Sequence, residues 1–291
     1  MFFTSFSVFL EHDKIRKRKM KIKDLFILFF FICITHELQI KKLISKNNEI
    51  NEIKKQEYII FGAGALLSSS AYFLENKELT PTEDILKLNK NNINFIDKKF
   101  ITDYSVNSDN ISDITLYTSL ALPIIYSLFA DYSTEEFINF NFRYAQMQLL
   151  NAGITLWTKN LVTRYRPYTY QENLDMKVRR QSDGRNSFYS GHTTIAFGAA
   201  SYFAYAYELS DNSRLSKNIV WISSIGLASS TGLFRILAGK HFLSEVIIGA
   251  AVGTGLGIMF VKQNSQNIFL TNTSKQVENI QIQYFTINFR I

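Results

Sequence analysis

The chain has 291 residues and a formal net charge of +7, and 46% of its residues are hydrophobic. This length holds one large domain or two small ones, and the charge suits an anionic partner such as a phospholipid headgroup or a phosphorylated substrate. Nucleic acid is disfavoured as a partner, because no basic stripe interleaved with aromatic residues appears beyond the N-terminus. The 3 proline residues favour long helices, and the single cysteine, Cys33, excludes an intramolecular disulfide.

The N-terminus has the pattern of a targeting signal. The basic stretch KIRKRKMKIK at 14–23 precedes the apolar stretch LFILFFFICIT at 25–35. A basic region before about 7–15 apolar residues is typical of a secretory signal peptide, and it is short for a membrane-spanning helix. Met20 could be the true start, because the pattern is complete from there. Residues 1–35 are predicted to be a cleaved signal peptide or an uncleaved anchor, and either directs the chain to a membrane.

Six apolar segments follow this signal and predict the architecture. Their lengths are typical of helices, so we expect an all-α bundle of about six helices. The polar stretch 36–57 is expected to be a linker or exposed helix, and the Asn- and Asp-rich stretch 75–112 a loop with one short amphipathic turn. Residues 280–291 alternate with period two and predict a short strand-like tail. The six segments lie at 58–74, 114–130, 142–158, 193–209, 218–234 and 242–262.

Polar residues within these segments limit how the bundle can meet a bilayer. One predicted helix carries Arg143, Gln146, Gln148 and Asn151. A bilayer tolerates such groups only where they face the bundle interior, and the mean hydropathy of −0.03 is low for six membrane spans. Two arrangements therefore stay open: a compact multi-pass bundle, or a helical domain that lies on the membrane.

Charged residues gather at the ends of the predicted helices. Lys159 and Arg166 lie seven residues apart, which is two helical turns, and share a face if the helix continues that far. Arg235 ends the fifth apolar segment and His241 begins the sixth. Glu245 follows His241 by four residues, the helical spacing at which a carboxylate can accept a hydrogen bond from an imidazole. Antiparallel neighbours would bring these helix ends to one face of the bundle.

The stretch FYSGHTT at 188–194 adds an anion-binding element to this face. Ser190 and Gly191 precede His192 and an apolar run. The first N–H groups of a helix lack internal partners, and the helix dipole favours negative charge there. With the nearby cations they would surround a phosphate. One histidine, oriented by a carboxylate, is then a candidate nucleophile and the other a candidate proton donor, which predicts metal-free phosphoryl transfer.

Three motifs in this order resemble the type 2 phosphatidic acid phosphatases (PAP2), a family that shares its site with vanadium haloperoxidases and bacterial acid phosphatases. The family pattern is Lys, six residues, Arg-Pro; then Pro-Ser-Gly-His; then Ser-Arg, five residues, His, three residues, Asp. The matching stretches are KNLVTRYRP at 159–167, YSGH at 189–192 and FRILAGKHFLSE at 234–245. The order and the spacings make the match specific, although any one motif alone would be weak.

The resemblance implies roles for residues at matching positions. His241 would be the nucleophile that forms a phosphohistidine, His192 the general acid, and Glu245 the carboxylate that orients His241. Tyr189 replaces the proline of the pattern, and Phe234 replaces its serine. Glu245 replaces an aspartate, which adds a methylene to the orienting group. The phosphate would be bound by Lys159, Arg166, Ser190, Gly191 and Arg235.

The sequence therefore predicts a metal-independent phosphatase that hydrolyses a phosphomonoester or diphosphate. The expected substrate is a phosphorylated lipid, of phosphatidate or polyprenyl diphosphate type, or a small phosphate ester. No cofactor and no metal are implied. Two alternatives are a vanadate-dependent haloperoxidase, because the same residues would hold vanadate, and a catalytically weakened structural or lipid-binding relative.

The resemblance also divides the chain. Residues 1–35 are the signal peptide or anchor, 36–112 an N-terminal helical region and loop, 113–262 a PAP2-like catalytic core, and 263–291 a C-terminal tail. The expected location is the bacterial cell envelope, in the inner membrane with the site facing the periplasm, or as a membrane-associated periplasmic protein.

Residues at positions that the family pattern does not specify receive structural interpretations. Arg164 matches no required position and is interpreted as a rim residue that contacts headgroups or solvent. The glycines of the last apolar segment are expected to permit close helix packing: Gly249, Gly253, Gly255 and Gly257.

Overall fold

The structure is a computed structural model that describes residues 50–74, 78–265, 270–277 and 280–287. The chain divides into two compact units, Met1–Lys54 and Lys55–Ile291. The first unit lies almost wholly outside the described residues, and so does the predicted signal or anchor. The fold and the site described below belong to the second unit.

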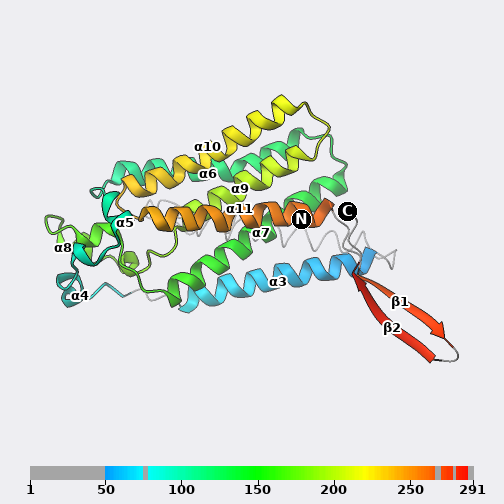
Figure 1. Ribbon diagram of the computed structural model, residues 1–291, viewed down its shortest axis with the longest axis horizontal. Coiled ribbons are helices and arrows are strands. Elements are labelled where there is room, and N and C mark those ends of the chain that lie inside the picture. The colour runs from blue at the N-terminus through cyan, green and yellow to red at the C-terminus, as the bar shows by residue number, and fades with distance from the viewer. Residues whose placement is uncertain (1–49, 75–77, 266–269, 278–279, 288–291) are drawn as a thin grey trace, which may run out of the picture. The chain divides into compact units, whose positions relative to one another are not determined.

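Long helices dominate the described residues, and the predicted all-α bundle is confirmed. Shorter helices connect them: α4 (Thr82–Leu86), α5 (Phe95–Lys99) and α8 (Met176–Arg179), with the 3-10 turns η1 (Lys90–Asn92), η2 (Pro167–Tyr170) and η3 (Ser182–Arg185). The six long helices are α3 (Ile50–Leu74), α6 (Val106–Phe129), α7 (Thr134–Leu161), α9 (Gly191–Glu208), α10 (Arg214–Leu237) and α11 (Leu243–Ser265) (Figure 1).

The segment 75–112 is more structured than the predicted loop. It contains α4, η1 and α5, and α6 begins inside it at Val106. Serine and asparagine caps account for these early helix starts, because Asn94 accepts from the amide of Asp97 and Ser105 accepts from the amide of Ser108. The C-terminal residues form an antiparallel hairpin of β1 (Leu270–Val277) and β2 (Ile280–Ile287), where the sequence predicts a strand over 280–291.

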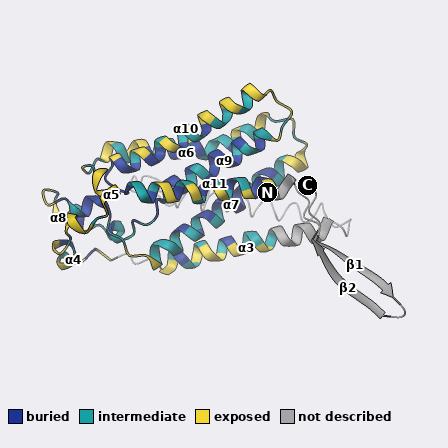
Figure 2. Ribbon diagram, viewed as in Figure 1, coloured by how far each residue is buried: buried dark blue, intermediate teal, exposed yellow. Residues whose placement is uncertain are grey.

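Helix α9 is the central helix and packs against α6, α7, α10 and α11. Figure 2 shows it as largely buried. Its contact with α11 is close, because a Cβ at Gly253 would lie 2.2 Å from the carbonyl oxygen of Thr194, and one at Gly257 would lie 2.2 Å from Ser201 Oγ. A Cβ at Gly249 would lie 2.8 Å from a backbone oxygen, whereas Gly255 has open space beside it. Three of the four glycines therefore allow the close packing that the sequence predicts, and they fix the register of α11 on α9.

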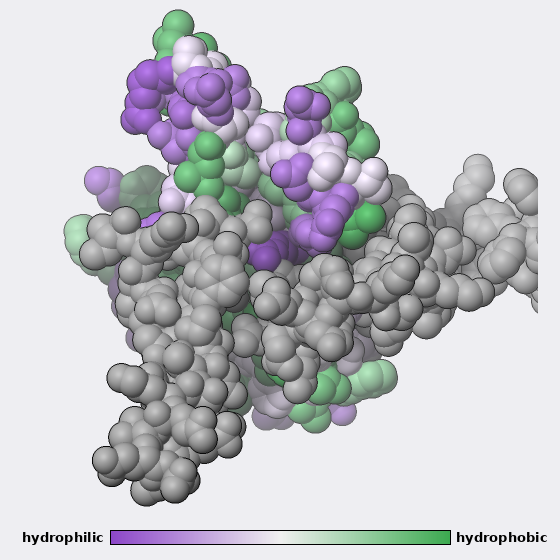
Figure 3. Space-filling view, turned by 90° about the vertical axis from the view of Figure 1, so that its right-hand side faces the viewer, coloured by the Kyte–Doolittle hydropathy of each residue, from purple (hydrophilic) through white to green (hydrophobic). Residues whose placement is uncertain are grey.

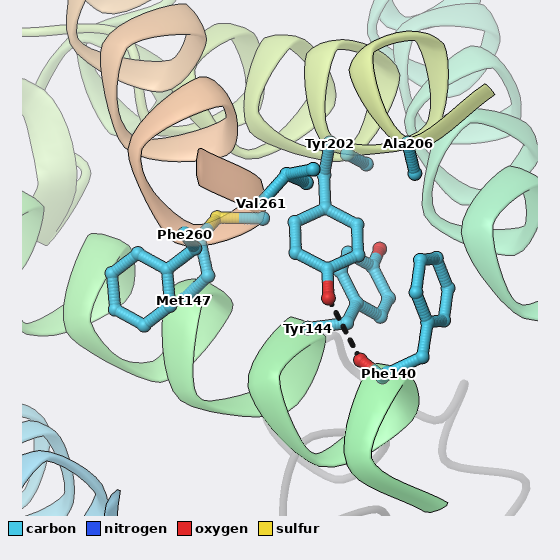
Figure 4. Close-up of a cluster of buried hydrophobic side chains, with 8 residues drawn as sticks. Phe140, Tyr144, Met147, Tyr202, Ala206, Phe260 and Val261 are labelled. Carbon is cyan, nitrogen blue, oxygen red and sulfur yellow. Dashed lines mark hydrogen bonds between the residues drawn. The ribbon is translucent and has the colours of Figure 1, made fainter. Parts of the chain in front are cut away.

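A cluster of large side chains joins α7, α9 and α11 at one end of these helices. In Figure 4 the rings of Phe140, Tyr144 and Tyr202 lie together, and Tyr202 donates a hydrogen bond to the carbonyl of Phe140 at 2.8 Å. Aromatic residues dominate the buried area of such clusters. The cluster packs these three helices together at this end, and the polar side chains of the site described below lie at the opposite end.

The side of the bundle is apolar. Within the residues that the structure describes, three helices are long and apolar enough to cross a membrane: α6, α10 and the stretch Leu243–Lys262 of α11. Large apolar side chains on them are exposed, among them Ile114, Ile222 and Ile247. Figure 3 faces the end where α9 stops and α10 starts, and there hydrophilic side chains are prominent among the residues described. An apolar belt bounded by polar ends supports association with a membrane.

The polar residues of α7 face inward, as a bilayer would require. Gln146, Gln148 and Asn151 are buried. Asn151 Nδ2 donates to the carbonyl of Thr194 at 3.0 Å, and Gln148 Nε2 donates to the carbonyl of Ile195 at 3.2 Å. These bonds tie α7 to α9, and among the described residues Gln148 Oε1 has no hydrogen-bond partner.

Candidate active site

The predicted site residues meet at one end of the helices. Lys159 lies in the last turn of α7, His192 in the first turn of α9 and Arg235 in the last turn of α10. His241 lies in the turn between α10 and α11, and Glu245 lies in the first turn of α11. The backbone amide of Ser190 donates to the carbonyl of Glu245 at 3.3 Å, so the starts of α9 and α11 are in direct contact.

His241 and Glu245 form a buried hydrogen-bonded pair. His241 Nδ1 lies 2.9 Å from Glu245 Oε2, and both side chains are almost fully buried. The same oxygen accepts from Ser187 Oγ at 2.6 Å and from the amide of Phe242 at 3.1 Å. A carboxylate only accepts, so Nδ1 carries the proton and Nε2 keeps its lone pair. The longer glutamate is thus held by three donors.

The electrostatic surroundings keep His241 neutral. Burial lowers the pKa of His241 well below its usual value, and the charges of Arg166, Lys159 and Arg235 lower this pKa further. A neutral imidazole with one nitrogen held as a donor presents a lone pair at the other nitrogen. This is the state in which histidine acts as a nucleophile.

His192 has a carboxylate partner that the sequence analysis missed. Its Nε2 lies 2.8 Å from Oδ1 of Asp113, which lies in α6. Asp109, one turn earlier in α6, pairs with Arg235 and lies 3.8 Å from Lys240 Nζ. Carboxylates in an apolar helix are rare and usually functional. Asp109 and Asp113, four residues apart in α6, were therefore the sequence signal for these two partners.

The three predicted phosphate-binding cations sit on this face with different partners. Lys159 Nζ donates to the carbonyl of Asn186 at 2.7 Å. Arg166 Nε donates to the carbonyl of Asp183 at 2.9 Å, and its Nη2 lies 3.3 Å from the Asp183 carboxylate. Among the described residues, the buried Nε of Arg235 has no hydrogen-bond partner. A buried donor without a partner is expected where a ligand supplies the acceptor.

Arg166 reaches the site by a different route from the one predicted. Helix α7 ends at Leu161, so the helix does not continue to Arg166 and the two cations do not share a helical face. Arg166 instead begins the turn η2, and its amide donates to the carbonyl of Gly184 at 2.9 Å. Pro167 favours an extended conformation at Arg166, so a helix would not continue through Arg166.

The start of α9 offers backbone donors. No side chain caps this helix, because the hydroxyl of Ser190 is bonded to Thr193 Oγ1 at 2.8 Å. The amides of its first turn, including that of Gly191, are therefore available to an anion. Tyr189, which replaces the proline of the motif, is buried, and its hydroxyl accepts from Thr155 at 3.2 Å. This bond ties the loop to α7 and substitutes for the rigidity of a proline.

Arg164 is not the rim residue that the sequence analysis predicts. Its Nη1 lies 3.1 Å from Glu245 Oε1, and its Nη2 lies 2.6 Å from Asp97 Oδ2. The physical reason is that two buried carboxylates meet behind His241 and need a shared cation. Lys240 was also missed: it is buried, with Nζ 5.2 Å from the Tyr104 ring centroid and 5.0 Å from that of Tyr168.

These groups define a class of site. A neutral imidazole, a second imidazole and several cations lie together at the open N-terminus of a helix, an arrangement that suits the binding of an anion such as phosphate. No cluster of three or more His, Cys, Asp or Glu side chains suited to a metal occurs within the part of the chain that the structure describes. The family model of the PAP2 superfamily matches residues 141–269. The resemblance inferred from the motifs is thereby confirmed.

Two curated proteins are similar to parts of the chain. A lipid A 1-phosphatase of Porphyromonas gingivalis is 36% identical over 83 residues, which cover 28% of this chain and 17% of that protein. A PA-phosphatase related-family protein of Dictyostelium discoideum is 21% identical over 185 residues, which cover 59% of this chain and 66% of that protein. The chain therefore spans less than two thirds of the length of either relative.

Two solved structures are also similar. The crystal structure of Aquifex aeolicus LpxE has 22% sequence identity and a TM-score of 0.38, and the match covers 54% of this chain and 87% of that one. A transmembrane PAP2 type phosphatidylglycerolphosphate phosphatase from Bacillus subtilis has 17% identity and a TM-score of 0.37, with 82% and 94% covered.

Proposed function

We propose that this protein is a metal-independent phosphatase that hydrolyses a phosphomonoester or diphosphate carried by a lipid. The observation that carries the proposal is the buried His241–Glu245 pair, with Nδ1 and Oε2 2.9 Å apart, among the charges of Lys159, Arg166 and Arg235. The match of residues 141–269 to the family model of the PAP2 superfamily supports the same reaction class. Fixed cations would supply the charge neutralisation that many phosphoryl-transfer enzymes obtain from Mg²⁺.

The reaction proceeds in two steps. The substrate phosphate binds to the three cations, to Ser190 and to the amides at the start of α9, including that of Gly191. The lone pair of His241 Nε2 attacks phosphorus, the bond to the leaving oxygen breaks, and His192 gives that oxygen a proton. A water molecule then attacks the phosphohistidine while His192 accepts its proton, and the phosphorus–nitrogen bond breaks to release phosphate.

The carboxylates have complementary roles in this mechanism. Glu245 holds His241 in the tautomer with its proton on Nδ1. Asp113 favours the protonated form of His192, since an opposite charge within hydrogen-bond distance stabilises an imidazolium. Burial and the charge of Arg235 lower the pKa of His192 to about 4, and Asp113 acts against this shift, so proton donation by His192 depends on this carboxylate.

The apolar belt favours a lipid as the carrier of the phosphate. A site at the end of helices with exposed apolar sides would lie near the headgroup level of a bilayer, where a lipid phosphate is found. The similarity to a lipid A 1-phosphatase agrees with this choice. With an N-terminal signal at 1–35, the site would face the periplasm of a bacterial cell.

The test is phosphate release by the full chain in detergent. The substrates are phosphatidate, phosphatidylglycerophosphate, a polyprenyl diphosphate, a lipid A phosphate and a soluble phosphate ester. We expect release from at least one lipid and none by His241→Ala. Equal release by both proteins would contradict the proposal. Tight lipid binding without release would favour a structural relative, and halide oxidation with added vanadate would favour a haloperoxidase.

A further inference from the structure

A network of buried polar groups lies behind the His241–Glu245 pair, on the side formed by α5. Its centre is Asp97, whose side chain is fully buried. Asp97 accepts from the amide of Ser244 at 2.9 Å, from Ser244 Oγ at 2.7 Å and from Asn94 Nδ2 at 2.6 Å. Burial acts to raise the pKa of Asp97, but the hydrogen bonds from Ser244, Arg164 and Asn94 outweigh it and lower this pKa. Asp97 is therefore an anion.

Arg164 connects this anion to the active-site carboxylate. Its guanidinium lies 2.6 Å from Asp97 Oδ2 and 3.1 Å from Glu245 Oε1. It also donates to Ser244 Oγ at 3.2 Å and lies over the ring of Phe242, 4.5 Å from its centroid. These four neighbours fix the plane of the guanidinium, and Arg164 is suited to this because its donors form a rigid fork.

The backbone of Arg164 reaches the other oxygen of the same carboxylate. The amide of Ser187 donates to the carbonyl of Arg164 at 3.0 Å, and Ser187 Oγ donates to Glu245 Oε2 at 2.6 Å. Within the described part of the chain Oε1 has no hydrogen-bond partner, and it contacts Arg164 as an ion pair. One residue thus constrains both oxygens of Glu245, directly at Oε1 and through Ser187 at Oε2.

We propose that Arg164 and Asp97 are positioning residues that hold Glu245 ionised and aligned on His241. This inference rests on the proposed function of the same site. Glu245 has one more rotatable bond than the aspartate of the PAP2 pattern, so its carboxylate needs more anchoring to present one oxygen to an imidazole. The charge of Arg164 stabilises the ionised carboxylate of Glu245 and orients it, and Asp97 holds the guanidinium of Arg164 in place.

The alternative is that Arg164 grips the substrate. The geometry disfavours it, because the donors of Arg164 face Asp97, Ser244 and Glu245. The two roles predict different kinetics. Loss of a positioning residue lowers kcat with little change in KM, whereas loss of a ground-state contact raises KM at constant kcat.

The kinetic test compares Arg164→Gln, Arg164→Lys and Asp97→Asn with the wild type. We expect Arg164→Gln to lower kcat by about 10²-fold, the size expected for a misplaced catalytic group. Arg164→Lys should recover part of the loss, because it keeps the charge and loses the fork. Asp97→Asn should lower kcat in the same way, and the double variant should fall little further than either single variant. In Arg164→Gln, the acid limb of the pH–kcat profile should move to higher pH, since the Glu245 carboxylate without its cation takes up a proton more readily.

Arg180→Gln is the matched control. Arg180 is a half-buried arginine whose Nε donates to the carbonyl of Thr80 at 2.9 Å. The Arg180→Gln variant loses a comparable hydrogen bond outside the active site, so its kcat should equal that of the wild type. Should Arg164→Gln not fold, the comparison of Arg164→Lys and Asp97→Asn with this control still decides the question.

A spectroscopic readout separates this inference from the proposed reaction. The ¹⁵N signals of the His241 ring report which nitrogen carries the proton, and His241→Gln assigns them. We expect the proton on Nδ1 in the wild type and in Arg180→Gln, and a mixture of tautomers in Arg164→Gln and Asp97→Asn. If no substrate is hydrolysed but this difference appears, the proposed function fails and the positioning role stands. Wild-type kcat or an unchanged tautomer in folded Arg164→Gln and Asp97→Asn would overturn the role.

Discussion

His192 Nε2 lies 2.8 Å from Asp113 Oδ1, and this contact joins the start of α9 to α6. The two residues are 79 positions apart in the chain. His241 has its own carboxylate on α11 at 2.9 Å, so each histidine of the site is paired with an acid from a different helix. Burial lowers the pKa of both imidazoles, and each carboxylate holds the ring that it contacts in one orientation.

Asp113→Asn should weaken the general acid. Without the carboxylate, the protonated form of His192 is less stable, so we expect kcat at pH 7 to fall by about 10–10²-fold. For the same reason the alkaline limb of the pH–kcat profile should move to lower pH. Asp131→Asn, at an exposed site beyond the other end of α6, is the matched control. The role of Asp113 is disproved if both variants give the wild-type profile.

Glu245→Gln should lower turnover by about 10²–10⁴-fold, because a neutral amide holds the His241 tautomer poorly. Glu245→Asp should retain more activity than Glu245→Gln, since it keeps the charge and restores the residue of the family pattern. Thermal unfolding is measured beside turnover. A role limited to the helix dipole predicts only about 0.3–1 kcal/mol of lost stability for Glu245→Gln, with little loss of turnover.

The acid limb of kcat/KM should lie below about pH 6.5, the usual pKa of histidine. Burial, with the charges of Arg166, Lys159 and Arg235, lowers the pKa of His241, so the imidazole stays neutral in acid. The free energy of unfolding should also decrease as the pH drops below about 6.5, because the unfolded histidine takes up a proton and the folded one does not. An acid limb at or above neutral pH, unaffected by Arg166→Gln, would exclude His241 as its source.

Turnover should survive exhaustive chelation. Three cationic side chains face the phosphate site and would take the role of a metal ion. The measurement is phosphate release after EDTA treatment and dialysis, with and without added Mg²⁺. Loss of turnover that Mg²⁺ restores would overturn the proposed mechanism.

The site should lie on the periplasmic side. In a Cys33→Ser background, a cysteine at Lys177 is expected to react with an impermeant thiol reagent in intact spheroplasts, and a cysteine at Asn212 is not. Both positions are exposed, and they lie at opposite ends of α9 in the fold. The reverse pattern would invert the topology, and labelling of both would favour a periplasmic domain.

The sequence by itself determined the features that depend on spacing along one helix. The apolar segments predicted the bundle, and the glycines of the last segment predicted close helix packing, which the structure shows against α9. The pairing of His241 with Glu245 was predicted from their separation of four residues, although His241 lies in the turn just before α11. Such features are local, because helical geometry alone fixes which side chains are neighbours.

Tertiary structure alone decided the pairs between elements. Asp113 meets His192 because one face of α6 packs on α9, and Arg164 meets Asp97, 67 residues away, because the loop after α7 turns back toward α5. No spacing rule encodes these contacts. For that reason the sequence predicted a rim position for Arg164, whereas it pairs with Asp97 and Glu245 in the structure. The desolvation of two carboxylates behind His241 requires a shared cation, and only the packed chain shows which residue supplies it.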